Sequence, residues 1–353
     1  MAIYLLIFIF WGLISLFVSQ TNRISLRQKR NIYLFTAGGS LLFLMGLRDI
    51  TVGTDLISYY NEFLNPEQFF QFRTSERGYS YFNLIFSKLG IGFQLYLFVI
   101  ASLIVTVISV LYKKFSKNII LSFYLFVTLG LFAMTMSGIR QSLAVTISII
   151  AFMFLMKNKT LLFIFFVILA SFFHNSAIIF LLVYFVKNFN MTKSKAILLY
   201  FASLASYFVL PIFMPLVINI IPERYLLRYL HLDVNINPLV IVVYILIPFA
   251  VLIIWKPAIK PNSSDSLISK LLLLSFFSVI IYFFATEIAL FERLIYYFMV
   301  FTTVLIPNVI MDIKDKSLKI VSIVACILLP LIMFLITTQG GSLGIDNYRF
   351  FWK

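Results

Sequence analysis

Long uncharged apolar runs are the feature of this sequence that most constrains its fold. Three of them are Ala2–Gln20, Asn118–Ile139 and Leu271–Thr286, and none contains a charged side chain. A hydrocarbon core of about 30 Å is crossed by roughly 20 helical residues. Because that core holds no water, a spanning segment must bond its own backbone amides. The apolar residues are continuous rather than alternating, which predicts helices and not a barrel.

The composition supports the same fold class. Hydrophobic side chains make up 62% of the 353 residues and charged ones 12%, whereas a soluble domain is about 45–50% apolar and about 25% charged. We predict an all-α polytopic integral membrane protein in which residues 1–353 form a single membrane domain. The runs predict about twelve transmembrane helices, some broken or re-entrant, near residues 2–19, 31–47, 91–111, 118–137, 141–156, 160–173, 175–186, 196–211, 238–255, 270–286, 291–310 and 319–337.

Lysine and arginine divide between alternate loops. Fifteen lysines and three arginines lie in residues 21–30, 112–117, 157–159, 187–195, 256–270 and 312–319. The remaining loops hold two lysines, eight arginines and ten of the 13 acidic residues. Cytoplasmic loops carry an excess of basic residues, so we predict that the lysine side is cytoplasmic and that both termini face outward. Orientation thereby explains the net charge of +15, and we expect no nucleic-acid partner.

Residues 160–186 decide this orientation. Apart from His174 they contain no basic or acidic side chain, and 27 residues are few for two spans. A single long helix would instead place nine downstream lysines outside, so we predict a hairpin that turns at His174, Asn175 and Ser176. Irregular backbone at membrane depth is tolerated where protein or a wet cavity covers it. His174 is therefore a candidate cavity residue.

Two outward segments, residues 48–90 and 212–237, are long enough to do more than connect helices. The planar fork of arginine binds phosphate bidentately, and a carboxylate beside it can orient the arginine or accept a proton. Arg140 is notable because it interrupts the otherwise uncharged residues 118–156, and ionisable groups near a bilayer are costly. The simpler alternatives are salt-bridged outer loops, an arginine that snorkels to the interface and a hydrogen-bonded structural histidine.

Several short motifs in this outward set resemble those of the EpsG family, which are Wzy-like polysaccharide polymerases of bacteria. The resemblance covers about residues 30–310 and depends on the order, spacing and common outward placement of the motifs. The motifs are Arg48, Gly53-Thr54-Asp55, Tyr59, Glu76-x-Gly78-Tyr79, Arg140-Gln141-x-Leu143-Ala144, His174-Asn175-Ser176-Ala177 and Glu292-Arg293.

The resemblance implies a glycosyltransferase of the bacterial inner membrane whose active site faces outward. Its expected substrates are oligosaccharide repeat units carried on undecaprenyl pyrophosphate, which it would join into O-antigen, capsule or exopolysaccharide. Membrane lipids surround it, and a chain-length regulator is a further candidate partner. We expect Arg48, Arg140 and Arg293 to stabilise the leaving pyrophosphate. Asp55, Glu76 and His174 compete as general base, with Asp55 and His174 ranked first. The other expected substrate contacts are Tyr59, Tyr79, Gln141, Arg224, Arg228 and Glu292.

No cofactor and no metal ion are expected. The single cysteine, Cys326, lies inside an apolar run, and the sequence contains no P-loop, HExxH or CxxC motif. A pyrophosphate-linked sugar donor is already activated, so the reaction needs no nucleotide.

Two other functions remain open. A glycan ligase would move glycan from the same lipid carrier onto another acceptor, and it would also need outward arginines. A flippase or transporter of lipid-linked sugars would place its charges near the bilayer midplane, whereas these charges cluster at one face. A purely structural membrane protein would leave the outward arginines without an explanation.

Overall fold

A computed structural model describes residues 1–72, 75–189, 191–220, 238–257, 263–339 and 344–353. In these ranges every regular element is a helix, and the one β-type contact is an isolated antiparallel bridge between Arg48 and Phe350. The all-helical fold class predicted from the apolar runs is confirmed. Arg224 and Arg228 lie outside the described residues, as does most of the predicted outer segment 212–237.

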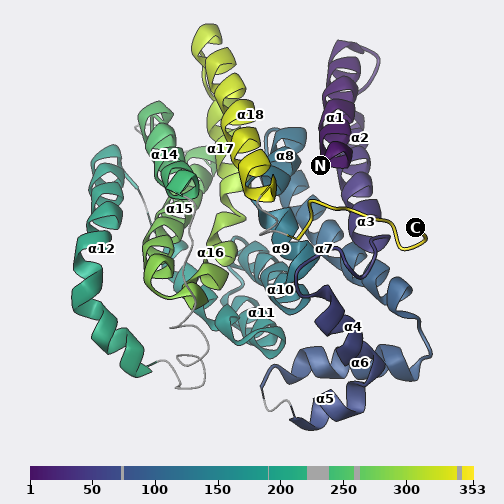
Figure 1. Cartoon of the computed structure of the whole chain (residues 1–353). Coiled ribbons are helices and arrows are strands. Elements are labelled where there is room, and N and C mark those ends of the chain that lie inside the picture. The colour runs from purple at the N-terminus through teal and green to yellow at the C-terminus, as the bar shows by residue number, and fades with distance from the viewer. Residues whose placement is uncertain (73–74, 190, 221–237, 258–262, 340–343) are drawn as a thin grey trace. The chain divides into compact units, whose positions relative to one another are not determined.

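The helices form two compact units (Figure 1). Unit 1 comprises residues 1–181 and 330–353, and unit 2 comprises residues 182–329. The 3₁₀-helix η2 (Asn175–Val186) and α18 (Lys316–Gln339) contribute to both units. The single membrane domain stays a prediction, because the division describes packing within each unit only.

The middle of unit 1 is built from helices with few exposed side chains, namely α7, α8, α9 and α10. Helix α10 packs against α7 and α11, and α6 packs against α4, α5 and α11. The helices of unit 1 are α1 (Ala2–Gln20), α2 (Leu26–Tyr33), η1 (Leu34–Gly38), α3 (Gly39–Gly46), α4 (Leu56–Leu64), α5 (Pro66–Phe72), α6 (Arg77–Lys88), α7 (Phe93–Phe115), α8 (Ile119–Thr128), α9 (Leu131–Ser137), α10 (Ile139–Leu155) and α11 (Thr160–Phe173).

A broken helix leads to the residues of interest. Helices α8 and α9 meet at Gly130 and are bent by 60°. Gly130 has a φ of +83°, a left-handed conformation that glycine adopts without steric cost. Helix α9 ends at Ser137, and α10 begins after a single residue, Gly138. Most side chains of both pieces are buried, which is the condition under which irregular backbone is tolerated at membrane depth.

Arg30, which lies in a predicted cytoplasmic loop, has structural partners. The guanidinium of Arg30 donates to the carbonyl oxygens of Ser116, at 3.2 Å, and of Lys113, at 2.5 Å, at the end of α7. Those carbonyls have no partner within the helix, and a cation is favoured beside them. Arg30 therefore caps α7 in addition to carrying charge for orientation.

Unit 2 is organised around α15 (Ser263–Glu287), which packs against α12, α14, η3, α16 and α17. The Nζ of Lys193 donates to the carbonyl oxygens of Leu252 and Trp255, so the start of α12 is bonded to the end of α14. Helices α16 and α17 are two parts of one bent pair with a 42° bend. The remaining bounds are α12 (Lys193–Ile220), α14 (Pro238–Ile254), η3 (Ala289–Phe291), α16 (Glu292–Met299) and α17 (Thr302–Met311).

The length and apolar composition of each helix show which helices could cross a membrane. Within the described ranges, five helices are long and apolar enough to span a membrane, and the number is seven if each bent pair counts as one span. All twelve predicted segments contain helix, but several are shorter apolar helices of 10–17 residues. The structure supports a polytopic membrane protein, and the figure of twelve spans stays a prediction.

The chain reverses where the sequence predicts a hairpin. Helix α11 ends at Phe173, His174 adopts an extended conformation, and η2 follows. The rings of Phe163 and Phe180 lie 6.3 Å apart although 17 positions separate them. Phe163 lies near the start of α11, so η2 must return along that helix. His174 thus lies at the turn of this hairpin.

Candidate functional site

Glu76 joins two helix breaks of unit 1 into one polar cluster. Its Oε2 accepts a hydrogen bond from Nη1 of Arg140 at 2.5 Å. Its Oε1 lies 2.5 Å from Nδ1 of His174. Oε1 also accepts the backbone N–H of Asn175 at 3.3 Å. Glu76, Arg140 and His174, which are 34 to 98 positions apart in the sequence, therefore meet at one carboxylate.

Local backbone geometry brings Glu76 to this position. Glu76 precedes α6 and has a φ of +59° and a ψ of 37°. A non-glycine residue in this left-handed region costs about 1–3 kcal/mol and persists only where its surroundings hold it. The contacts with Arg140 and His174 supply that hold. A carboxylate at the start of a helix is also favoured by the helix dipole.

Gly78 allows α6 to approach α11 closely enough for these contacts. A Cβ on Gly78 would lie 2.9 Å from both Cβ and the carbonyl oxygen of Phe172. Phe172 is two residues before His174, so the spacing of α6 from α11 fixes the spacing of Glu76 from His174. The sequence motif contains Gly78, but the reason for a glycine there appears only when the two helices are seen together.

We expect Gly78→Ala to reduce activity by about 100-fold, because a misplacement of about 1 Å can cost that much. The added methyl must push α6 away from backbone atoms of α11, which do not yield as a flexible side chain would. The activity that the family resemblance implies, formation of polymer, is measured per unit of folded protein. Gly39→Ala is the matched control, since Gly39 lies within a helix and a Cβ there meets nothing within 4 Å. Equal activity of the two variants would contradict the positioning role.

One face of α4 lies against Arg140. The hydroxyl of Tyr59 accepts from Nε of Arg140 at 3.5 Å, and the guanidinium carbon lies 5.7 Å from the centre of the Tyr59 ring. Glu62, which the sequence analysis missed, is buried one turn further along and interacts electrostatically with Arg140. Asp55, Tyr59 and Glu62 are spaced four and three residues apart, and this spacing places them on one helical face. That spacing is the signal that would have identified Glu62.

One guanidinium nitrogen of Arg140, Nη2, is not bonded to any of the residues that the structure describes, whereas Nη1 and Nε are engaged. The Arg140 side chain is 24% exposed, against 8% for Glu76 and 11% for His174. Arg140 also lies in the first turn of α10, where helix dipoles and free N–H groups attract anions. The cluster can therefore accept an anion beside Arg140.

The electrostatics of the cluster keep Glu76 ionised. Burial alone raises the pKa of Glu76, but contact with His174, the charge of Arg140 and the N–H of Asn175 outweigh burial and lower that pKa to about 2. An efficient general base has a pKa near the operating pH. Glu76 is therefore poorly suited to take a proton at neutral pH, and it is well suited to hold Arg140 and His174 in place.

This low pKa predicts an acid-dependent loss of stability. Because the pKa of Glu76 falls from its ordinary 4.5 to about 2, its stabilising contribution is complete above about pH 4.5 and disappears as the pH approaches 2. In thermal unfolding of the purified protein, the unfolding temperature of wild type should be higher than that of Glu76→Gln at pH 7. The difference between the two unfolding temperatures should shrink between pH 4.5 and 2. Glu67→Gln, which changes a carboxylate on the surface, should show no such trend. A difference independent of pH would refute the assignment.

Arg48 occupies a different setting. Arg48 is only 2% exposed. Its Nη1 donates to the carbonyl oxygen of Met45, and its Nη2 donates to that of Met136 at 3.3 Å. Burial lowers the pKa of Arg48 to about 10, with the Tyr348 and Tyr4 rings opposing that shift, so the guanidinium stays charged at neutral pH. Met136 is four residues before Arg140, so Arg48 stabilises the same helix break from inside.

The C-terminal segment covers Arg48. Asp49 N donates to the carbonyl of Arg349 at 3.0 Å, and Phe351 N donates to that of Leu47 at 3.1 Å. Gly53 N donates to the carbonyl of Gly344 at 2.8 Å. Direct contact of Arg48 with a pyrophosphate, which stays a prediction, would require this segment to move.

The other predicted site residues are distributed as follows. Gln141 and Tyr79 are buried, and the ring of Tyr79 packs edge-on against that of Tyr59 at 5.6 Å. Asp55 is exposed and precedes α4. Glu292 and Arg293 begin α16 in unit 2, where Glu292 is hydrogen-bonded to Tyr296. That Glu292 and Arg293 share a site with Arg140 stays a prediction.

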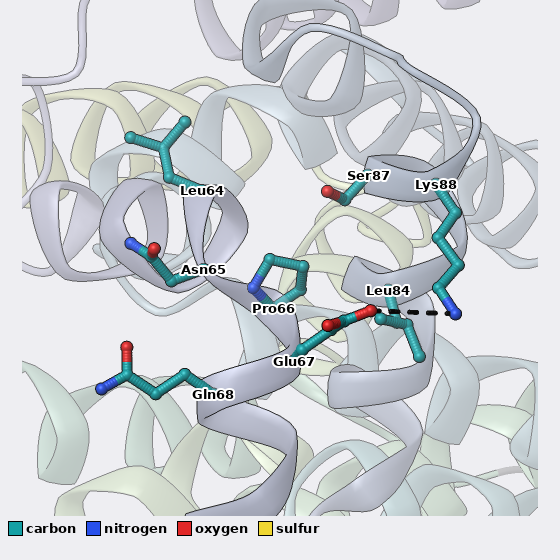
Figure 2. A pocket seen from close by; sticks show the side chains of 8 residues that line it. All are labelled: Leu64, Asn65, Pro66, Glu67, Gln68, Leu84, Ser87 and Lys88. Atoms are coloured by element: carbon teal, nitrogen blue, oxygen red, sulfur yellow. Dashed lines mark ion pairs between the residues drawn. The ribbon is translucent and has the colours of Figure 1, made fainter.

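A groove lies at the far end of α6 from Glu76. Its volume is about 510 Å³, and the side chains that line it come from the α4–α5 turn, α5 and α6 (Figure 2). Glu67 and Lys88 form an exposed ion pair of 4.0 Å there. The lining residues are Leu64, Asn65, Pro66, Glu67, Gln68, Leu84, Ser87 and Lys88.

Apolar helices surround a partly buried Glu–Arg–His cluster, and they define an integral membrane protein with a polar site at its helix breaks. The sequence profile of the EpsG family matches residues 31–350, and the chain belongs to that family. The match confirms the resemblance and extends it beyond residue 310 into the C-terminal segment that covers Arg48. No curated protein sequence and no solved structure matches the chain. Family membership suggests a Wzy-like polysaccharide polymerase.

Proposed function

We propose that this protein polymerises oligosaccharide repeat units carried on undecaprenyl pyrophosphate at the outer leaflet of the bacterial inner membrane. The product would be an O-antigen, a capsule or an exopolysaccharide. The observation that carries the proposal is the Glu76–Arg140–His174 cluster in a member of the EpsG family. Its arginine is held by a carboxylate, and within the described residues its Nη2 has no hydrogen-bond partner.

The reaction transfers a growing glycan from its carrier to the next repeat unit. A sugar hydroxyl of the acceptor attacks the anomeric carbon of the donor, and the bond from that carbon to the pyrophosphate oxygen breaks. The electron pair leaves with the lipid pyrophosphate. The developing negative charge lies beside Arg140, and donors that are already oriented stabilise such charge without the cost of reorganising solvent. The positive end of α10 adds to this effect.

The proton of the attacking hydroxyl needs an acceptor within hydrogen-bond reach. His174 fits this role because Glu76 holds its Nδ1 side, which leaves Nε2 for the acceptor hydroxyl, as a carboxylate orients a catalytic histidine in other enzymes. Asp55 remains the competing base, since it lies on the α4 face that carries Tyr59. Glu76 acts as a positioning residue in this scheme.

The glycan profile of a strain that lacks this protein tests the proposal. We expect single repeat units on the cell surface and no long chains, with long chains restored by the wild-type gene. Complete absence of surface repeat units would favour a flippase. Long chains that accumulate on the lipid carrier without reaching their final acceptor would favour a ligase. Either of these two results would overturn the polymerase assignment.

A further inference from the structure

Helix α6 exposes an apolar stripe along one side. Tyr81, Ile85 and Leu89 follow each other at intervals of four residues, and their exposed fractions are 51%, 55% and 67%. Residues at that interval share a helical face. The face that holds Tyr79 and Asn83 is buried. Helix α6 is therefore amphipathic, with its polar and aromatic contacts inside and an apolar stripe at the surface.

Helix α5 packs beside the same apolar stripe. The ring of Phe70 packs edge-on against the ring of Tyr81 at 4.9 Å. This contact joins α5 to the stripe of α6. We call the surface of Tyr81, Ile85 and Leu89 the outer apolar surface.

The outer apolar surface continues that of the membrane helices. Phe172 contacts Gly78 at the start of α6 and is itself 54% exposed. Helix α11 also exposes Phe165 and Ile168, as expected for a helix that faces lipid. At the other end of α6, α7 begins four residues after Leu89 and exposes Leu95 and Leu103. Exposed apolar side chains thus run from the apolar helix α11 and from α7, which is long enough to span a membrane, to the two ends of α6.

The direction of α6 and the position of its polar groups fit a membrane interface. Figure 1 shows α6 running roughly crosswise to α1, a helix long enough to span the membrane. The groove at the end of α6 carries Glu67, Gln68 and Lys88 (Figure 2). An interfacial helix buries its apolar face about 5–10 Å into the boundary of headgroups and acyl chains. Lysine and tyrosine are suited to that depth.

We propose that α5 and α6 lie in the membrane interface, with the outer apolar surface in contact with lipid and the groove of Figure 2 facing water. Glu76 directly precedes α6, so the interface sets the depth of the Glu76–Arg140–His174 cluster at the level of lipid headgroups. A lipid-linked pyrophosphate lies at that level. This last consequence rests on the proposed function, whereas the lipid contact of α5 and α6 does not.

Nitroxide spin labels test the contact in the full-length protein in nanodiscs of phosphatidylethanolamine and phosphatidylglycerol. Labels are attached to Ile85→Cys, Leu89→Cys and, in case one fails to fold, Tyr81→Cys. Cys326, the single native cysteine, is replaced by serine in all of them. Gln68→Cys is the control on the groove side. The ratio of collisions with oxygen to collisions with a water-soluble nickel complex should be several-fold higher at residues 85 and 89 than at residue 68.

Two results would overturn the proposal. Equal ratios at residues 68, 85 and 89 would place the stripe in water. Low collision rates with both reagents, together with spin–spin coupling between labels, would show that a second protein copy covers the stripe. The labels report depth whether or not the protein makes polymer. Failure of the lipid contact is therefore distinct from failure of the polymerase assignment, which the glycan profile of the deletion strain decides.

Discussion

Replacing Arg140 with alanine is expected to abolish long glycan chains while single repeat units still reach the cell surface. Removing one oriented donor from an oxyanion site typically costs about 100- to 1000-fold in rate, and Arg140 is the exposed cation of the cluster. Arg140→Lys should fail as well, because an ammonium group cannot reproduce the planar fork that contacts Glu76 and a phosphate together. The measurement is the length distribution of the glycan in a complemented deletion strain.

Arg77→Ala is the matched control for this experiment. Arg77 is exposed in the first turn of α6, directly after Glu76, and belongs to the same outward arginine set. Its loss should leave long chains intact. Full activity of Arg140→Lys would remove the argument for bidentate contact, and full activity of Arg140→Ala would remove Arg140 from the mechanism altogether.

Glu76→Gln is expected to be nearly as damaging, for a different reason. Glutamine keeps the shape of the side chain but removes the charge that holds Arg140 and His174. Loss of one partner from a buried ion pair costs about 3–5 kcal/mol, and the 24% exposure of the Arg140 side chain places this case at or below the lower end of that range. We expect polymer yield to fall by about 100-fold through misplacement of the two partners, together with a lower unfolding temperature.

Glu67→Gln serves as the control, since Glu67 pairs with Lys88 on the surface and both side chains are at least 66% exposed. Exposed pairs of this kind contribute about 0–1 kcal/mol. Wild-type chain length in Glu76→Gln, with an unfolding temperature equal to that of Glu67→Gln, would show that the carboxylate at position 76 has no positioning role.

The fold was predictable in class and in the places of its helices, because apolar runs are a local property of the chain. The break at His174 was also predictable, since 27 uncharged residues had to turn for the lysines downstream to stay on one side. The bend at Gly130 was not predicted, because residues 118–137 form one continuous apolar run. The number of crossings was not predictable either, because short helices such as α11 and η2 depend on neighbours for cover.

The candidate site was predictable as a set of residues but not as an arrangement. Arg140 and His174 stand out because each is an ionisable residue in an apolar stretch. Glu76 was ranked as a possible base, and only its contacts show that it holds both of them and stays ionised. Glu62 was missed, since an acid in a polar segment has no local signal beyond its spacing from Tyr59. Arg48 was grouped with Arg140 by its residue type, and the C-terminal segment that covers it lies about 300 positions away.

The sequence by itself determined that this protein is an α-helical membrane protein, and it predicts lysine on one side and a set of arginines on the other. It also determined which family the chain resembles, because hydropathy, charge and short motifs are written residue by residue. Only the tertiary structure decided which of those arginines meets a carboxylate. Ion pairs form between residues that packing brings together. Gly78 leaves no room for a Cβ between α6 and α11, and this close packing of the two helices brings Glu76 to Arg140 and His174.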